Sequence, residues 1–509
     1  MRLILLVLLG CAVACVGTGA PPPIPLNPVR FLSINDVTVA DTVAGDRGGM
    51  ARVSTVRKRL HDQGPVVFAL AGDALSPSVA SKFFWGRQMV EALNAAQLDY
   101  ATFGNHEFDI EPDTLVALIA ASDFKWLSSN CTRPNGSAFP KVLPWDTLRV
   151  SGHKVGLFGV TLQGSYPRYV RCSNPDSAAH RAIEILASEG ADLIVGITHQ
   201  TMNADRELLG REPKLDLVLG GHDNEALYSD AQDSVVSGRH AVKADANATS
   251  LQFVTLWGGK GNWRQAVGRV RIDGTLPKDP LVSIVVDRWQ DSLRRRLGPL
   301  RTVGTTQVAI APSDSSSRRK ESLLGDLVTD AIRSGTGADV ALLNAGTLHL
   351  DQAIPPGPIT NHQLEAIFPF SDQTRVVSFG LTGTRLRTIL EHAVSQRILG
   401  TGGFLQVSGI SFTFDPARPS GSRLVGDIRR GDGKVLGPAD TVSVTLNSYP
   451  ACQGGDGYQI PEASSMCGQL RSAPRAVDLL SRYITDSLGG RVEAPRSSRV
   501  VQANSTNPG

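Results

Sequence analysis

Six short apolar runs, most of which end in Asp, Asn or His, constrain this sequence more than any other feature. The runs are RFLSIND, VVFALAGD, DYATFGNHE, KVGLFGVT, ADLIVGITH and LDLVLGGH, and they lie between residues 29 and 286. Stretches with helical spacing separate them, among them GGMARVSTVRKRL and SAAHRAIEILASEG. Strand–helix–strand repetition predicts an α/β fold, in which the side chains that follow the strands gather at one edge of the sheet.

The polar residues at the ends of these runs are the types that bind divalent metal ions. They are Asp36, Asp73, Asn105, His199, His222 and Asn224. Two ions about 3.5–4 Å apart can hold a phosphoryl group and lower the pKa of a shared water from about 16 to near 7. One such residue is more often structural, but six at successive strand ends favour a metal centre. Glycines precede several of them, and we expect sharp backbone turns there.

The length predicts two or three domains, and the pattern along the chain favours two. The chain has 509 residues, of which 41% are hydrophobic and 19% charged, so wholesale disorder and a multi-span membrane protein are not expected. The net charge is only +3 and no long basic run occurs, which argues against a nucleic-acid partner. We expect one α/β domain over residues 29–286, a connector with a charged helix over 287–317, a second α/β domain over 318–493, and a tail over 494–509.

The amino-terminal residues 1–20 have the layout of a secretory signal, with one Arg, an apolar run and small residues. A lipobox-like LLGC also occurs, so soluble export (periplasmic or secreted) and a lipid anchor at the cell surface both stay open. Contact with a membrane is expected only through such an anchor. Of the six cysteines, four follow the leader, and we predict the pairs Cys131–Cys172 and Cys452–Cys467. Four unpaired thiols are the alternative.

The order of the motifs resembles that of a known family. ND-x-x, GDxxxxS, GNHEFD, THQ and GGHDN resemble, in that order, the calcineurin-like metallophosphoesterases. The downstream ESLLGDL, NAGTL and GGDGY are similar to those of the 5′-nucleotidase/UDP-sugar hydrolase branch. The resemblance covers about residues 29–490. It implies an α/β fold with a layered αββα metallophosphoesterase domain and a smaller α/β carboxyl-terminal domain for substrate specificity.

The resemblance also implies roles for the strand-end residues. Asp36 would bind the first metal and Asp73 would bridge both, whereas Asn105, His199 and His222 would complete the second site. Two departures affect the first site: Thr38 stands where the family usually has His, and Asn224 where it usually has His or Gln. We therefore expect looser binding there, or a preference for Mn²⁺ or Mg²⁺ over Zn²⁺. A decayed site is the harsher alternative.

A catalytic pair follows the third run. By the resemblance, His106 would stabilise charge on the phosphoryl oxygens or protonate the leaving group, and Asp109 would orient it. An imidazole held by a carboxylate is also a sensible acid on chemical grounds alone. Glu107, between them, is interpreted as structural.

The second domain would select the substrate. The resemblance implies that Phe370 and Tyr449 sandwich a nucleobase, an interaction of about 1–3 kcal/mol per contact. Asp456 would bind ribose hydroxyls and Asn344 the base or sugar. Lys320 and His349 stand where the family usually has phosphate-holding arginines. From sequence alone Phe370 could equally be a core aromatic.

Together these features predict an exported phosphohydrolase with two divalent metal ions (Mn, Mg or Zn) that releases phosphate from nucleotides or a related phosphate ester. A cyclic-nucleotide phosphodiesterase, a UDP-sugar hydrolase and a thiosulfohydrolase are alternatives on the same fold. A nucleotide-binding surface protein with a decayed metal site is the alternative outside enzymes. The sequence leaves the oligomeric state open.

Overall fold

The structure is a computed structural model that describes residues 27–43, 45–164, 166–228, 238–311, 317–350, 353–370, 374–493 and 498–503. These residues divide into two compact units, of which the first comprises residues 27–77 and 84–291 and the second comprises 78–83 and those from 292 onward. The expected leader lies outside the described residues, as do 494–497 and 504–509 of the expected tail. No helix within the described ranges has the length and apolar character needed to cross a bilayer.

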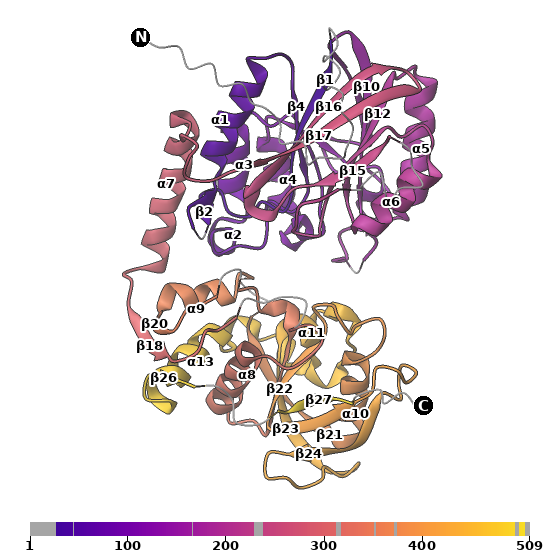
Figure 1. The fold of residues 1–509 in the computed structure, drawn as a ribbon. Coiled ribbons are helices and arrows are strands. Elements are labelled where there is room, and N and C mark those ends of the chain that lie inside the picture. Colours follow the sequence, from indigo (N-terminus) through magenta and orange to yellow (C-terminus); the bar gives the residue numbers. More distant parts are fainter. Residues whose placement is uncertain are drawn as a thin grey trace, which may run out of the picture. The chain divides into compact units, whose positions relative to one another are not determined.

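The first unit contains two large sheets (Figure 1). The seven-stranded sheet has the order β17 (Asn262–Arg271), β16 (Ser250–Gly259), β1 (Val29–Ile34), β4 (Val67–Ala71), β5 (Tyr100–Thr102), β6 (Lys125–Leu127) and β8 (Val142–Leu143). The six-stranded sheet has the order β14 (Leu227–Tyr228), β15 (His240–Lys243), β13 (Leu217–Gly221), β12 (Leu193–His199), β10 (His153–Thr161) and β9 (Trp145–Val150).

All six predicted runs are strands, and they pair in parallel within their sheets. In the first sheet β1 pairs with β4 and β4 with β5, and in the second β10 pairs with β12 and β12 with β13. Parallel strands end at the same edge, so the polar residues that follow them share one edge of each sheet.

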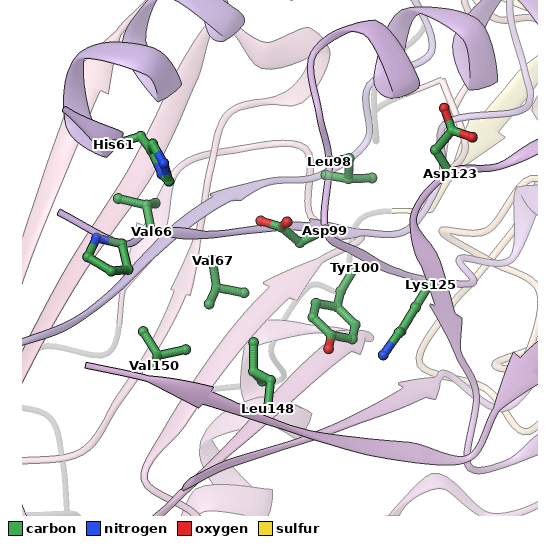
Figure 2. A pocket seen from close by; sticks show the side chains of 11 residues that line it. His61, Val66, Val67, Leu98, Asp99, Tyr100, Asp123, Lys125, Leu148 and Val150 are labelled. Atoms are coloured by element: carbon green, nitrogen blue, oxygen red, sulfur yellow. The ribbon is translucent and has the colours of Figure 1, made fainter. Parts of the chain in front are cut away.

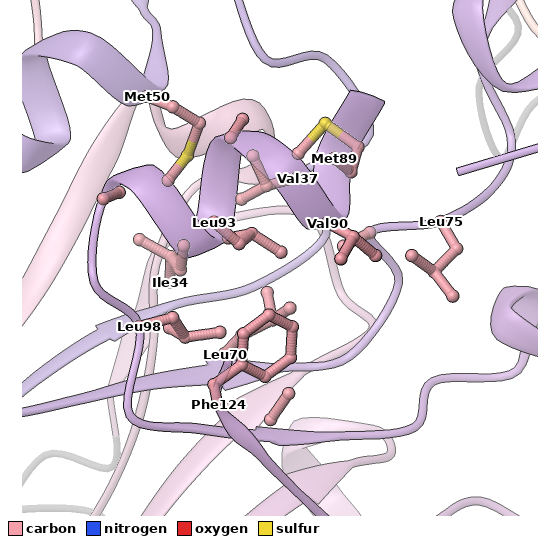
Figure 3. Packing of buried hydrophobic residues seen from close by; sticks show 14 of the residues in the cluster. Ile34, Val37, Met50, Leu70, Leu75, Met89, Val90, Leu93, Leu98 and Phe124 are labelled. Atoms are coloured by element: carbon pink, nitrogen blue, oxygen red, sulfur yellow. The ribbon is translucent and has the colours of Figure 1, made fainter. Parts of the chain in front are cut away.

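The two sheets pack face to face, and helices cover both outer faces. Phe31 of β1 packs between the sheets with Leu157 of β10, whereas the neighbouring Leu32 faces the helices. On that side lie α1 (Met50–His61), α3 (Arg87–Ala95) and α4 (Pro112–Ala121). Figure 3 shows Met50 of α1 and Leu93 of α3 in the cluster that contains Ile34 and Leu70. On the other side lie α5 (Pro175–Ser188) and α6 (Met202–Arg211). The αββα layering predicted for this domain is confirmed.

The second unit is also α/β. Its largest sheet has the order β21 (Val376–Thr382), β25 (Thr441–Asn447), β19 (Val340–Asn344) and β22 (Leu405–Ser408). Two three-stranded sheets accompany it: β24 (Leu424–Arg430), β23 (Ile410–Phe414) and β27 (Val500–Gln502), and β20 (Gly357–Thr360), β18 (Thr302–Thr306) and β26 (Arg491–Val492). Residues of β19 pack alternately into two hydrophobic cores, one on each side of the sheet. One core includes residues of α10 (Gly383–Ala393), and the other includes residues of α8 (Leu323–Thr336) and α13 (Ala476–Arg482).

The expected connector contains the predicted charged helix and a short strand, but the helix starts earlier than the sequence suggested. Its charged helix, α7 (Pro280–Leu297), begins seven residues before residue 287, because Asp279 accepts a hydrogen bond from the backbone N–H of Leu281 (2.9 Å) and Pro280 starts the first turn. Strand β18 pairs with β20 and β26 within the second unit.

Both predicted disulfides are present. Cys131–Cys172 joins the short strands β7 (Cys131–Thr132) and β11 (Arg171–Cys172), which pair with each other. Cys452–Cys467 closes a loop of 15 residues that contains Asp456. Disulfides persist in oxidising compartments, which supports the expectation of export.

Candidate metal centre

Two acidic ligand candidates follow β1 and β4 in an unusual backbone conformation. Asp36 and Asp73 have φ values of 53° and 56°, in the left-handed region. The N–H of Asp36 donates to the carbonyl of Gly72 (3.0 Å), which ties the two turns together. His222 also has a positive φ of 84°, and its backbone N–H donates to Asp36 Oδ2 (2.9 Å).

His199 connects the two sheets. It ends β12 in the six-stranded sheet, and its Nδ1 lies 2.8 Å from the carbonyl oxygen of Ala71 in the seven-stranded sheet. That contact directs Nε2 toward Asp73, whose Oδ2 is 3.1 Å away. A Cβ on Gly221 would lie 2.2 Å from the same Ala71 oxygen, so this position requires glycine for space.

Gly104 is also required for space. A Cβ there would lie 2.0 Å from Asp73 Oδ1. Neither Gly104 nor Gly221 has a positive φ, so the turn that the sequence predicted is not the reason for either glycine. At Gly72, where φ is 78°, the turn does require it.

Asp36, Asp73 and His199 form a compact buried group. One ligand atom from each lies within 4.8 Å of the others, and the exposed fractions are 6%, 5% and 0%. Burial raises the pKa of Asp36 to about 6, although His199 opposes the rise. Burial also opposes ionisation of Asp73, but His199 and His106 outweigh it and hold the pKa of Asp73 below its usual range. Two buried carboxylates in this group favour a bound positive charge. Either a proton or a metal ion can supply that charge, so the two would compete for the same ligand atoms.

Two neighbouring side chains, His222 and Asn105, are further candidate metal ligands. The ring of His222 lies 5.3 Å from that of His199, and burial followed by repulsion from His199 lowers the pKa of His222 to about 4. Its imidazole is thus unprotonated at neutral pH, which is the form that binds metals. The buried Oδ1 of Asn105 has no hydrogen-bond partner within the described residues. Carboxylate, amide oxygen and neutral imidazole together suit a divalent ion such as Mn²⁺ or Zn²⁺.

The structure places the two departures at the first site in different surroundings. Asn247 Oδ1 accepts hydrogen bonds from the backbone N–H groups of Thr38 (3.1 Å) and Val39 (3.2 Å), and Thr38 Oγ1 lies 3.4 Å from it. Asn247 therefore organises the loop where a histidine was expected. Asn224 is exposed, with a φ of 61°, and its carbonyl accepts from Ala246 N (3.0 Å).

His106 and Asp109 lie beside the metal-type group, in the short helix η1 (His106–Asp109). His106 Nδ1 is 2.8 Å from Asp109 Oδ2, and Ser76 Oγ donates to that oxygen (3.0 Å). The backbone N–H of His106 donates to Asp73 Oδ1 (2.9 Å). Burial disfavours the imidazolium, but Asp109 and Asp73 outweigh it and raise the pKa of His106 to about 9. At neutral pH His106 is a cation with a proton to donate.

Glu107 holds the same turns from behind. It is fully buried, and its Oε2 accepts from the N–H groups of Asp73 (2.8 Å) and Gly104 (2.6 Å). Its Oε1 accepts from those of Ala74 (2.7 Å) and Leu75 (3.1 Å). These contacts agree with the interpretation of Glu107 as structural.

The second unit brings some of its predicted residues together. Asn344 Nδ2 donates to Asp456 Oδ2 (3.1 Å), and Asp456 has a φ of 56°. Burial raises the pKa of Asp456, although Asn344 opposes the rise. Tyr449 lies close to the loop that carries Asp456: a Cβ built on Gly455 of that loop would lie 2.4 Å from the Tyr449 ring.

The other predicted residues of this unit fall in two places. Phe370 is only 8% exposed, and its ring packs edge-to-face on that of His349, 5.9 Å away. Lys320 is exposed, and its carbonyl accepts from Gln406 Nε2 (2.9 Å).

A hollow of about 380 Å³ lies elsewhere in the first unit (Figure 2). Val67, Tyr100 and Lys125, which line it, are the first residues of β4, β5 and β6. It is therefore at the amino ends of strands whose carboxyl ends carry Asp73 and Asn105. Ligands of α/β sheets bind at the carboxyl ends, so we assign the functional site there and not to this hollow.

Comparison with known proteins agrees with this geometry. The calcineurin-like phosphoesterase family matches residues 29–225, and the 5′-nucleotidase C-terminal domain matches residues 302–463. The chain belongs to the 5′-nucleotidase family. Both domains of that family are thus present in this chain, in the order that the motifs predicted.

Individual relatives in this family are distant. A snake venom 5′-nucleotidase from Crotalus adamanteus is 26% identical over 465 residues, which is 82% of this chain and 78% of that protein. The 5′-nucleotidase of Homo sapiens is 25% identical over 488 residues, covering 86% and 83%. Among solved structures, a 5′-nucleotidase precursor from Thermus thermophilus has a TM-score of 0.78 at 22% identity and covers 94% of this chain and 99% of its own. Sulfate thiohydrolase SoxB from the same species has a TM-score of 0.73 at 17% identity, covering 96% and 99%. The solved structures share the fold.

Sequence reasoning missed several residues around the candidate metal centre. Asn35 Nδ2 donates to Asp36 Oδ2 (2.6 Å) while its Oδ1 accepts from Ala244 N (2.7 Å). Asn247 and Ser76 act similarly on Thr38 and Asp109. Only Asn35 carried a signal, since it adjoins the first aspartate; the others are brought in by the fold.

Proposed function

We propose that this chain is an exported phosphohydrolase that uses two divalent metal ions to release phosphate from nucleotides. The observation that carries the proposal is the buried group of Asp36, Asp73 and His199 with the His106–Asp109 pair beside it. Membership of a metallophosphoesterase family supports the reaction class. The two disulfides support export.

The metal-binding residues would be Asp36, Asp73, Asn105, His199, His222 and Asn224. When bound there, divalent ions would neutralise phosphoryl oxygens and lower the pKa of a water molecule. Asp73 is suited to bridge two ions because its oxygens diverge: Oδ1 accepts from His106 N, and Oδ2 faces His199. Asn224, which is exposed, would be the weakest contributor.

His106 would act on the substrate directly. Its Nδ1 is engaged by Asp109, so the proton on Nε2 is the one available to a phosphoryl oxygen or to the leaving oxygen. Asp109 keeps the imidazole protonated and, held in turn by Ser76, fixes its orientation. General acid catalysis of this kind contributes about 10²–10⁴-fold to the rate.

The second unit would select a nucleoside. Asp456, half-buried beside Asn344, would accept hydrogen bonds from ribose hydroxyls, and Asn344 would contact the base or sugar. Phe370 and Tyr449 would stack on the base, and Lys320 and His349 would bind phosphate. The edge-to-face pair of His349 and Phe370 supports a shared role for those two residues.

The test is phosphate release by the chain from Pro21 onward, with Mn²⁺, Mg²⁺, Zn²⁺ or EDTA. AMP, UDP-glucose, 2′,3′-cyclic AMP and an aryl phosphate form the substrate panel. We expect metal-dependent turnover of AMP that EDTA abolishes and that His106→Asn lowers by at least about 10²-fold. His180→Asn is the matched control, because His180 also pairs with a carboxylate, Glu212 (3.0 Å), but lies elsewhere.

A folded protein that binds nucleotide but releases no phosphate with any metal would overturn the proposal and favour a binding protein. Turnover of the cyclic nucleotide or of UDP-glucose in preference to AMP would keep the metal chemistry and replace the substrate.

A further inference from the structure

Lys243 is a buried cation that no metal-ligand or substrate role accounts for. It is the last residue of β15 and has no solvent exposure. A buried charge is costly unless it is paired and hydrogen-bonded. Its partners therefore indicate why a lysine stands at this position.

The ammonium group contacts the two loops that carry the histidines of the metal centre. Nζ donates to the carbonyl oxygens of Gln200 and Gly221, the latter at 2.7 Å. Gln200 directly follows His199, and Gly221 directly precedes His222. One side chain thus holds the backbone next to both imidazoles.

The contact to Gly221 continues through its peptide group to the metal centre. The carbonyl that Lys243 binds belongs to the same peptide unit as the N–H of His222, which donates to Asp36 Oδ2 (2.9 Å). A hydrogen bond at one end of a peptide group polarises it and strengthens the bond at the other end. Lys243 therefore both orients this peptide and supports its bond to Asp36.

Two carboxylates complete the network. Lys243 Nζ lies 2.7 Å from Asp223 Oδ2 and 3.1 Å from Asp205 Oδ2. The fully buried Asp205 accepts from Thr198 Oγ1 (2.6 Å) and Gln200 Nε2 (3.0 Å), the residues on either side of His199. Asp223 accepts from Met202 N (2.7 Å) at the start of α6.

Gly220 is part of the same arrangement. A Cβ there would lie 2.7 Å from Asp205 Oδ2 and 2.9 Å from Lys243 Cε. The first glycine of the GGH motif thus makes room for the ion pair, and it has no positive φ that a turn would require.

We propose that Lys243 is a positioning residue that holds His199 and His222 in the geometry that binds the metal ion. The inference rests on the proposed function, because it assumes that these imidazoles bind metal. Removing residues that orient metal ligands typically costs about 10–100-fold in metal affinity. Lys243 should act on that affinity and not on contacts with the substrate.

The experiment measures Mn²⁺ affinity of the metal-free protein by isothermal titration calorimetry, and then kcat and KM for AMP at saturating Mn²⁺. The variants are Lys243→Met and Lys243→Met/Asp205→Asn, of which the second removes the buried charge that the first leaves unpaired. Lys214→Met is the control, because Lys214 forms an exposed ion pair with Glu184 (2.6 Å) in the same unit.

We expect at least about 10-fold weaker Mn²⁺ binding in the folded variants, with KM for AMP unchanged at saturating metal. If Lys243→Met does not fold, the double variant decides the question. A folded double variant with wild-type Mn²⁺ affinity would overturn the inference alone. If the wild-type protein binds Mg²⁺ or Zn²⁺ but not Mn²⁺, the same titrations are made with that ion. A wild-type protein that binds none of the three ions would overturn the proposed function and this inference with it.

Discussion

Replacement of Glu107 by Gln tests whether the turns of the candidate metal centre depend on one buried carboxylate. Each oxygen of Glu107 accepts two backbone N–H groups, those of Asp73 and Gly104 on Oε2 and those of Ala74 and Leu75 on Oε1. Gln has one amide oxygen and one NH₂ group. In either orientation, the NH₂ group faces two N–H donors that have lost their acceptor.

The expected cost follows from the two bonds that disappear. A hydrogen bond to a charged group contributes about 1.5–3 kcal/mol, so two such bonds correspond to about 3–6 kcal/mol. Burial, followed by repulsion from Asp73, raises the pKa of Glu107, so removing its charge recovers part of that amount. We expect the free energy of unfolding of the first unit to fall by about 3 kcal/mol.

Tryptophan fluorescence during urea unfolding is suited to this measurement. All six tryptophans lie between residues 85 and 289, within the first unit. The signal therefore follows that unit alone. Glu111→Gln is the matched control, because it makes the same change of charge at an exposed position four residues away.

The reasoning is refuted if Glu107→Gln and Glu111→Gln unfold at the same urea concentration with the same slope. Phosphate release should fall in the same variant, since Glu107 fixes the backbone of Asp73. A stable variant with lost activity would mean that Glu107 acts on the chemistry and not on the turns.

Three further predictions follow from other contacts. Gly104→Ala should displace Asp73, weaken Mn²⁺ binding and destabilise the first unit by about 1–3 kcal/mol. Gly210→Ala is the control, because a Cβ at Gly210 would meet open space. Equal Mn²⁺ affinities of the two variants in calorimetric titrations would contradict this prediction. Burial raises the pKa of Asp326 from 3.8 to about 8, so between these pH values the folded chain keeps a proton that the unfolded chain releases. As the pH rises through this range, the free energy of unfolding should therefore fall by up to about 1.4 kcal/mol per pH unit. Asp326→Asn should remove this loss, and parallel stability–pH curves for the two proteins would refute the assignment. Serines in place of Cys452 and Cys467 should cost about 3 kcal/mol for the 15-residue loop, as measured by circular dichroism during urea unfolding, and an unchanged midpoint would argue against it.

The strands and the edge that they share were predictable because buried parallel strands read as apolar runs with a clear end. The start of α7 was also readable, since Asp279 and Pro280 form a standard helix start, but the prediction placed the helix from residue 287. The predicted disulfide pairs are confirmed in the structure. The roles of the individual site residues stay predictions.

Contacts between distant segments were not predictable. Asn247 bonds the backbone of Thr38 across 209 positions of sequence, and His199 contacts Ala71 from another sheet. The glycines show the same limit. The sequence suggested turns, but at Gly104 and Gly221 the cause is an atom of another segment that lies too close for any side chain.

The left-handed backbone conformation at the candidate metal centre restricts the residue types that these positions tolerate. Asp36, Asp73, His222 and Asn224 all have positive φ, and Asp, Asn and His are the non-glycine residues most often found in that region. The residue types that ligate metals are thus also those that the backbone tolerates. Glutamate offers the same carboxylate as aspartate but lacks its short side chain, which can hydrogen-bond locally in this conformation. An exchange that conserves the chemistry, such as Asp→Glu, would therefore be opposed by the main chain, and diversity in this centre is more accessible through exchanges among Asp, Asn and His.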